Sequence, residues 1–146
     1  MMRSLLISLL IVPGCAWAKA ERAFHAAMAA EWQTKFTESP ATGIADFQLD
    51  LETLTLSWAI DYRELSGAPT TLALYGPAQP GTNGAKILDL IRQDAVSPVK
   101  GSAKVTAAQV QYLLFGWTYV NLATAKFPSG EIRGQLDVKP VKAAAP

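Results

Sequence analysis

Residues Leu54 to Tyr62 alternate apolar side chains with small or polar ones without a break. The apolar members are Leu54, Leu56, Trp58, Ile60 and Tyr62. Successive side chains of a β-strand point to opposite faces of its sheet. A period of two over this length therefore predicts a strand with one face in a core and the other toward water. A helix would place its apolar residues three or four positions apart instead.

Other short segments have similar patterns. Strands are predicted at Ile44–Asp50, Thr70–Tyr75, Ala85–Ile91, Val99–Val105, Trp117–Thr124 and Glu131–Val138. The polar residues 50–53 join the first of these to the alternating strand as a hairpin. Regular spacing of short strands and turn residues predicts a mainly all-β chain, an antiparallel β-sandwich or barrel of about seven to nine strands.

Two segments carry helical signals. Thr106 and Gln109 have the spacing of a capping box, and Gly116 supplies a stop, so a short helix is predicted over about 107–115. The stretch from Lys19 to Trp32 is ambiguous. Its alanines favour a helix, although its apolar residues alternate as in a strand, and local evidence slightly favours the helix.

The N-terminus has the order of a secretory signal peptide. A positive Met1–Arg3 precedes the apolar residues 4–12, and Ala16-Trp17-Ala18 gives a cleavage signal. The apolar run is shorter than the roughly 20 residues of a membrane span. We expect residues 1–18 to be a signal peptide cleaved after Ala18, 19–140 a β domain and 141–146 a disordered tail. The alternatives are an uncleaved anchor or a lipid anchor at Cys15.

Charge and cysteine content limit the classes of partner and the cross-links that we expect. Without Arg3 of the signal segment, basic and acidic residues balance, and their signs are interspersed. No basic stripe is present to follow phosphates, so nucleic-acid binding is not expected. We expect no membrane insertion after signal cleavage either. Cleavage after Ala18 also removes the single cysteine, which leaves no disulfide.

The C-terminal half resembles the CHRD (chordin-type) domain family, in a bacterial single-domain form. The resemblance rests on Gly76-Pro77-Ala78 with Gly81 and Asn83-Gly84, on residues 106–116, on Tyr119-Val120-Asn121 and on the run 127–136, FPSGEIRGQL. It extends from about Phe24 to Val138 and is weaker in the N-terminal half. It implies a strand at Phe24, against the local helix propensity.

The chain departs from this family at three histidines. CHRD domains typically carry a His-x-His before the Gly-Pro loop and another histidine after the Tyr-Val-Asn segment. Ala73, Tyr75 and Ala123 occupy these positions here, and the only histidine is His25. Such imidazoles on neighbouring strands can hold a transition metal. Their absence predicts no histidine-based metal site, no metal ligands and no cofactor.

A polar cluster is the remaining candidate site. Tyr75, Asn121, Glu131 and Arg133 can line a polar pocket near the positions of the missing histidines. The simpler interpretation, which we favour, is a structural one. Glu131 and Arg133 lie two residues apart on one face and can form an ion pair that fixes the sheet register.

Aromatic side chains and His25 offer further alternatives. Trp32, Trp58 and Trp117 can form a sugar-binding platform, but core packing is the favoured interpretation because each buries a large apolar area. No serine or cysteine has a recognisable setting beside His25, so catalysis by His25 is unsupported. We expect no catalytic residues.

The sequence therefore predicts an exported protein, periplasmic or secreted, that acts as a non-catalytic binding or structural module. Its partner is an unknown protein or a cell-envelope component. Two alternatives remain open. One is a metal-binding protein that uses other ligands such as Glu131, Tyr75 or His25, and the other is an enzyme of unrecognised type.

Overall fold

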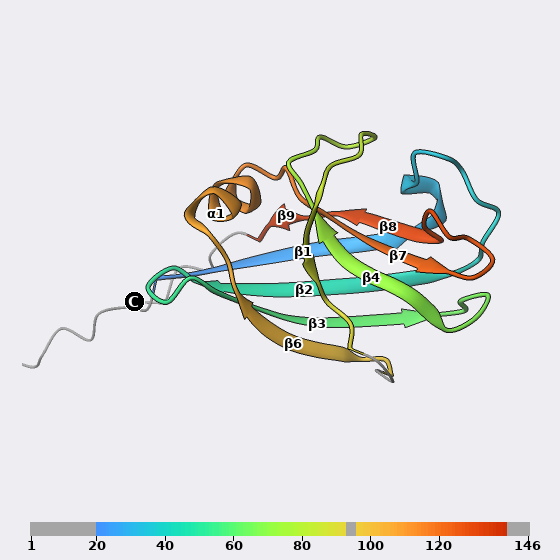
Figure 1. Ribbon diagram of the computed structural model, residues 1–146, viewed down its shortest axis with the longest axis horizontal. Coiled ribbons are helices and arrows are strands. Elements are labelled where there is room, and N and C mark those ends of the chain that lie inside the picture. The colour runs from blue at the N-terminus through green and yellow to red at the C-terminus, as the bar shows by residue number, and fades with distance from the viewer. Residues whose placement is uncertain (1–19, 93–95, 140–146) are drawn as a thin grey trace, which may run out of the picture.

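In the part of the chain that the structure describes, nine antiparallel strands form one sheet that curls into a half-barrel, with one short α-helix at one end (Figure 1). The computed structural model describes residues 20–92 and 96–139. The elements are β1 (Glu21–Ala29), the 3-10 helix η1 (Ala30–Trp32), β2 (Thr42–Asp50), β3 (Thr55–Arg63), β4 (Pro69–Tyr75), β5 (Lys86–Asp89), β6 (Val99–Lys104), α1 (Ala107–Leu114), β7 (Tyr119–Thr124), β8 (Ile132–Gln135) and β9 (Asp137–Val138). The predicted signal peptide 1–18, Cys15 and the tail 141–146 lie outside the described residues.

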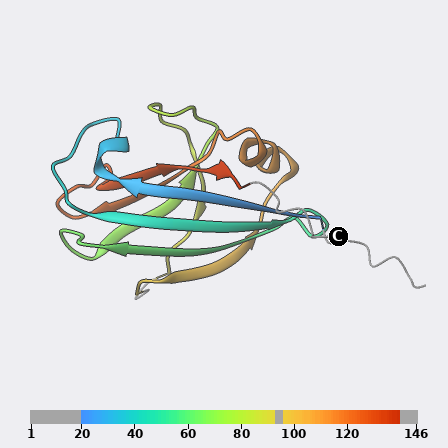
Figure 2. The ribbon, with the colours of Figure 1, turned by 180° about the vertical axis from the view of Figure 1, so that it is seen from behind.

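The strands are ordered β5-β4-β7-β8-β1-β2-β3-β6 across the sheet, and β9 pairs with β1. The curl brings β4, β7 and β8 over β1, β2 and β3, and the core lies between these two halves (Figures 1 and 2). This confirms the predicted mainly antiparallel β fold. Its shape is a sheet folded partly onto itself, with β5 and β6 as the two edges.

Strand β1 shows tertiary packing overriding helix propensity. It pairs with β2 along its whole length, with Phe24 opposite Phe47. Phe24, Ala26 and Met28 are buried, while the intervening side chains face outward. The slight local preference for a helix was wrong here, because the buried face offers alternating apolar residues to the opposite half of the sheet.

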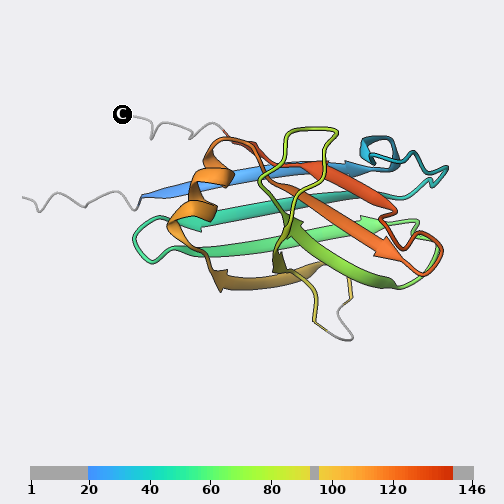
Figure 3. The same cartoon turned by 45° about the horizontal axis from the view of Figure 1, so that its top comes forward.

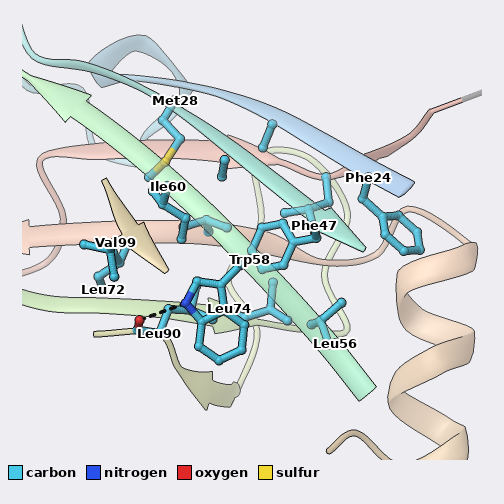
Figure 4. Packing of buried hydrophobic residues seen from close by; sticks show 14 of the residues in the cluster. Phe24, Met28, Phe47, Leu56, Trp58, Ile60, Leu72, Leu74, Leu90 and Val99 are labelled. Carbon is cyan, nitrogen blue, oxygen red and sulfur yellow. Dashed lines mark hydrogen bonds between the residues drawn. The ribbon is translucent and has the colours of Figure 1, made fainter. Parts of the chain in front are cut away.

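The strongly alternating segment forms β3, which pairs with β2 as a hairpin, as predicted. Its inward residues Leu56, Trp58 and Ile60 pack in the centre of the core (Figure 4). Leu54 differs from the prediction. It has a φ of 52° and belongs to the turn, so the strand begins one residue later.

The indole ring of Trp58 also joins the two halves of the sheet. Trp58 Nε1 donates a 3.1 Å hydrogen bond to the carbonyl of Leu90, just after β5 (Figure 4). This bond links a strand near one edge of the sheet to the opposite edge. The side chain is only 9% exposed, so core packing is confirmed for this tryptophan.

The helix forms where the capping signal predicts it. Thr106 accepts a hydrogen bond from the backbone of Gln109, whose side chain accepts one from the Thr106 backbone. Gly116, with a φ of 72°, ends the helix in a conformation that glycine adopts at little cost. No helix within the described ranges is long and apolar enough to cross a membrane.

The last predicted strand is divided in two. Its first part, β8, pairs with β7, while β9 pairs with β1. The break falls at Leu136, whose backbone N–H donates to the carbonyl of Thr118. Because the chain changes partner at this point, Val138 does not join Ile132 in the core and is 40% exposed.

Candidate functional site

Strands β4, β7 and β8 lie side by side (Figure 3). Three of the four predicted polar residues meet on their outer face. Tyr75 lies opposite Tyr119, and Asn121 lies opposite Arg133. Paired residues of antiparallel strands point to the same side of the sheet. The inward side chains of these strands belong to the core, so this outer face is free to build a separate site.

Arg133 is the central residue of this face, and it is only 2% exposed. Its guanidinium carbon lies 3.5 Å from the centroid of the Tyr119 ring, which in turn stacks on Tyr75 at 5.3 Å. Its terminal nitrogens donate to Asn83 Oδ1 at 3.0 Å and to the carbonyl of Thr82. Burial lowers the pKa of the guanidinium, and the interaction with Tyr119 works against that shift.

The loop 76–84 folds over this face and is held by side chains of the sheet. The hydroxyl of Tyr119 accepts a 3.1 Å hydrogen bond from the backbone of Gly84. Gln135 Nε2 donates to the carbonyls of Ala78 at 2.9 Å and Gly116 at 2.8 Å. The glycine-rich turn signal in the sequence therefore corresponds to a loop that is fixed at several points.

The segment that contains Gln33 covers the other side of this outer face. Gln33 Nε2 donates to Asn121 Oδ1 at 2.9 Å, and Asn121 Nδ2 donates to the carbonyl of Ser129 at 3.0 Å. Between these segments and the sheet lies a hollow of about 240 Å³, which Arg133 and Tyr75 also line. We refer to it as the Arg133 hollow. Burial raises the pKa of the Tyr75 hydroxyl within it.

Glu131 belongs to a different cluster, although the sequence grouped it with Arg133. It is fully buried and accepts hydrogen bonds from Ser39 at 2.7 Å, Thr124 at 2.6 Å and both the hydroxyl and the backbone of Ser66. We call these four residues the hydroxyl cluster. Burial opposes ionisation of Glu131, but the hydrogen bonds outweigh it and hold the pKa of this carboxyl below its usual range.

The expected ion pair between Glu131 and Arg133 therefore does not form. No such pair occurs in the part of the chain that the structure describes. Each residue has other polar partners, since hydroxyls surround Glu131 while carbonyl oxygens and an aromatic ring surround Arg133. The register of β8 is instead fixed by its backbone pairing with β7.

The three positions at which the sequence analysis expected family histidines lie on the same outer face. Ala73 is opposite Asn121, and Ala123 on β7 is opposite Thr71 on β4. Ala73 is 0% exposed and Ala123 is 3% exposed, so both alanines are buried in protein. Of these three positions, only that of Tyr75 lines the Arg133 hollow.

His25 lies elsewhere, on the outer side of β1. Its Nδ1 is 3.0 Å from Asp46 Oδ1, and Lys139 Nζ is 2.6 Å from the same oxygen. Tyr75, Glu131 and His25 are thus in three separate settings. Within residues 20–92 and 96–139, no group of three or more His, Cys, Asp or Glu side chains is arranged to hold a metal ion.

Two tryptophans depart from the packing prediction. Trp32 is 54% exposed, and Trp117 is 40% exposed and stacks on Phe115 at 5.1 Å. They lie on η1 and near the end of α1 respectively, so they do not share one platform with Trp58 in the core.

Sequence reasoning missed the loop residues that complete both clusters. Gln33, Asn83, Ser39 and Ser66 reach the sheet from irregular segments. No periodic pattern marks such residues, because their positions depend on how each loop crosses the sheet. Only the turn-rich composition of residues 76–84 pointed toward one of these segments.

Comparison with known proteins gives one match. The sequence model of one protein family, described as the CHRD domain, matches residues 24–136. This range runs from β1 to just beyond β8, and it contains both the Arg133 hollow and the hydroxyl cluster. No curated protein and no solved structure matches the chain.

Proposed function

The chain belongs to the CHRD domain family, and we propose that it is a non-catalytic binding module that works outside the cytoplasm. The export part of this proposal rests on the signal-like order of residues 1–18 and places the protein in the bacterial periplasm or in the secreted fraction. The partner is a protein or a component of the cell envelope.

The Arg133 hollow is the observation that supports a binding role. Its walls are polar side chains held in place by hydrogen bonds between segments far apart in the sequence, such as Gln33 with Asn121 and Arg133 with Asn83. A hollow with several fixed polar groups is the usual form of a small-ligand site. Fixed groups favour binding because little conformational entropy is lost when the ligand arrives.

The settings of two described residues support the non-catalytic part. Among the described residues, His25 contacts Asp46 and is not bonded to a serine or threonine hydroxyl. Glu131 is fully buried beneath hydroxyl donors, so it is poorly placed to exchange a proton with a substrate.

The proposal is tested with the full chain expressed in its native host. We expect it in the periplasmic or secreted fraction, with a mass that corresponds to cleavage after Ala18. The purified protein is then titrated with fractionated envelope extract and followed by ¹H–¹⁵N NMR. We expect amides around the hollow, including Gly84 and Ser129, to shift.

A blocked hollow provides the control. Thr34 is exposed and lines the hollow, so Thr34→Trp should fill the space without altering the core, and the shifts should disappear. The bound compound is recovered and weighed by mass spectrometry. A cytoplasmic location contradicts the export part, and conversion of the compound to a product contradicts the non-catalytic part.

A further inference from the structure

We propose that the ligand of the Arg133 hollow is a carboxylate, which Arg133 binds through its remaining N–H groups. This inference rests on the proposed function, because it names the ligand class of the same hollow. The carboxylate belongs either to a small free acid or to the C-terminus of a polypeptide.

The first argument is the unbalanced charge of Arg133. The guanidinium is almost fully buried, yet no carboxylate in the described ranges forms an ion pair with it. Its two hydrogen bonds go to neutral oxygens, those of Asn83 and Thr82. Burying a charge is costly unless an opposite charge or further hydrogen bonds compensate. The ring of Tyr119 compensates in part.

The second argument is the number of unused donors. A guanidinium has five N–H groups. In Arg133 the Nε–H and one N–H on each terminal nitrogen have no hydrogen-bond partner among the described residues. The buried side-chain atoms without a partner in that part of the chain are Thr118 Oγ1 and Gln135 Oε1. The Nε of Arg133 is not among these buried atoms, so its N–H is not sealed in protein, and Arg133 lines the hollow.

The third argument is the chemistry of the hollow itself. The residues that line it, all within the described ranges, include no Asp or Glu, but they include the amides of Gln33, Asn83 and Asn121. On the neighbouring strand β5, Lys86 and Asp89 pair with each other at 3.0 Å. A site with a cation, several N–H donors and no acid selects an anion over a neutral or cationic ligand.

Size and shape favour a carboxylate among anions. The planar guanidinium matches the two oxygens of a carboxylate, which can accept parallel hydrogen bonds from it. The stacked rings of Tyr75 and Tyr119 lie 5.3 Å apart at 12° and offer an aromatic wall beside the charge. A hollow of about 240 Å³ accommodates a carboxylate with a small apolar group attached.

The test is an NMR titration of the full chain that records Arg Nε–H signals as well as backbone amides. The probes are benzoate and its neutral analogue benzamide, and the peptide Ala-Ala-Phe with a free or an amidated C-terminus. We expect benzoate to shift the Arg133 Nε–H and the Gly84 amide to saturation, while benzamide leaves them unchanged. A response to the free peptide but not to its amide assigns the carboxylate to a polypeptide C-terminus. A response to benzoate alone assigns it to a small acid.

A matched pair of variants tests the charge without removing Arg133. Thr34 lines the hollow and makes only a long 3.5 Å contact with Asn83. T34E supplies an internal carboxylate, so we expect benzoate affinity to fall at least about tenfold. T34Q has the same size without the charge, and we expect it to bind benzoate at least about tenfold more tightly than T34E does.

The outcomes separate the two proposals. If benzamide binds the hollow as well as benzoate does, or if T34E binds benzoate as tightly as T34Q, the carboxylate inference is wrong and the binding module stands. If neither these probes nor envelope fractions shift the signals of the hollow, both proposals are wrong.

Discussion

Glu131 accepts a 2.6 Å hydrogen bond from the hydroxyl of Thr124, and no cation pairs with it in the described part of the chain. Its other partners are Ser39 and Ser66, which come from two separate loops. A buried carboxylate is usually neutralised by a basic side chain, whereas here hydroxyl and amide donors alone hold the charge. The cluster therefore ties the loops around residues 39 and 66 to the turn before β8.

The first prediction concerns the stability that Glu131 provides. Glu131→Gln replaces an oxygen acceptor with an NH₂ group, which would then face hydroxyl donors that have lost their partner. We expect the free energy of unfolding to fall by about 1–3 kcal/mol, as for other buried hydrogen-bonded groups that lose a partner. Urea denaturation measures this change. Glu52→Gln in the exposed β2–β3 turn is the control, and an equal loss in both variants would contradict the role of the cluster.

The second prediction is the pH dependence of the same difference. The folded-state pKa of Glu131 is lowered, so its ionised form is favoured by folding. The stabilisation is then present above the ordinary Glu pKa of roughly 4.3 and is lost as pH falls through the lower folded-state value. We expect the stability gap between wild type and Glu131→Gln to be full at pH 7 and to shrink below about pH 4. Urea unfolding at several pH values checks this, and a gap that widens in acid would refute it.

The third prediction concerns the bond between the two halves of the sheet. Trp58→Phe removes the indole N–H that reaches the Leu90 carbonyl at 3.1 Å and leaves space in the core. We expect a loss of about 2–3 kcal/mol from the unpaired carbonyl and the cavity together. Trp32→Phe is the matched control, because Trp32 is 54% exposed, and its effect should stay within about 0.5 kcal/mol. Thermal unfolding of both variants distinguishes them.

The fold was largely predictable because its strands carry their own periodic pattern. The local sequence alone was enough to predict the inward residues of β3 and the capping box of α1. It was not enough for strand β1, because the alanines of β1 suit a helix, and only the resemblance to a known family identified β1 as a strand. The break at Leu136 was also missed, because a change of strand partner leaves the alternation of side chains almost intact.

The site was predicted only in part, for a related reason. The register of β4, β7 and β8 places Tyr75, Asn121 and Arg133 together, and they were grouped from the sequence because the family resemblance pointed to one site there. Spacing within one strand could not show that Glu131 and Arg133 have separate partners. Those partners come from loops, whose paths depend on long-range contacts that a local pattern does not record.

The fourth prediction tests how closely β6 packs on the core. Gly101 lies opposite Trp58, and a Cβ atom added at Gly101 would be 2.6 Å from Cζ2 of the indole ring. The ring cannot move away freely, because its Nε1 is bonded to Leu90. We expect Gly101→Ala to cost about 1–3 kcal/mol, as for other overpacked sites. Gly67→Ala is the control, since no atom lies within 4 Å of the added Cβ, and it should be close to neutral.

A double-mutant cycle separates this clash from a general intolerance of alanine in β6. Phenylalanine lacks the indole atoms that the new Cβ would meet, so Gly101→Ala should cost less when Trp58→Phe is already present. We expect a coupling of at least about 0.5 kcal/mol, the lower end of the range for residues in contact. Denaturant unfolding of the four proteins gives this value. Additive effects would mean that the two residues do not constrain each other and that the cost arises in the backbone of the edge strand.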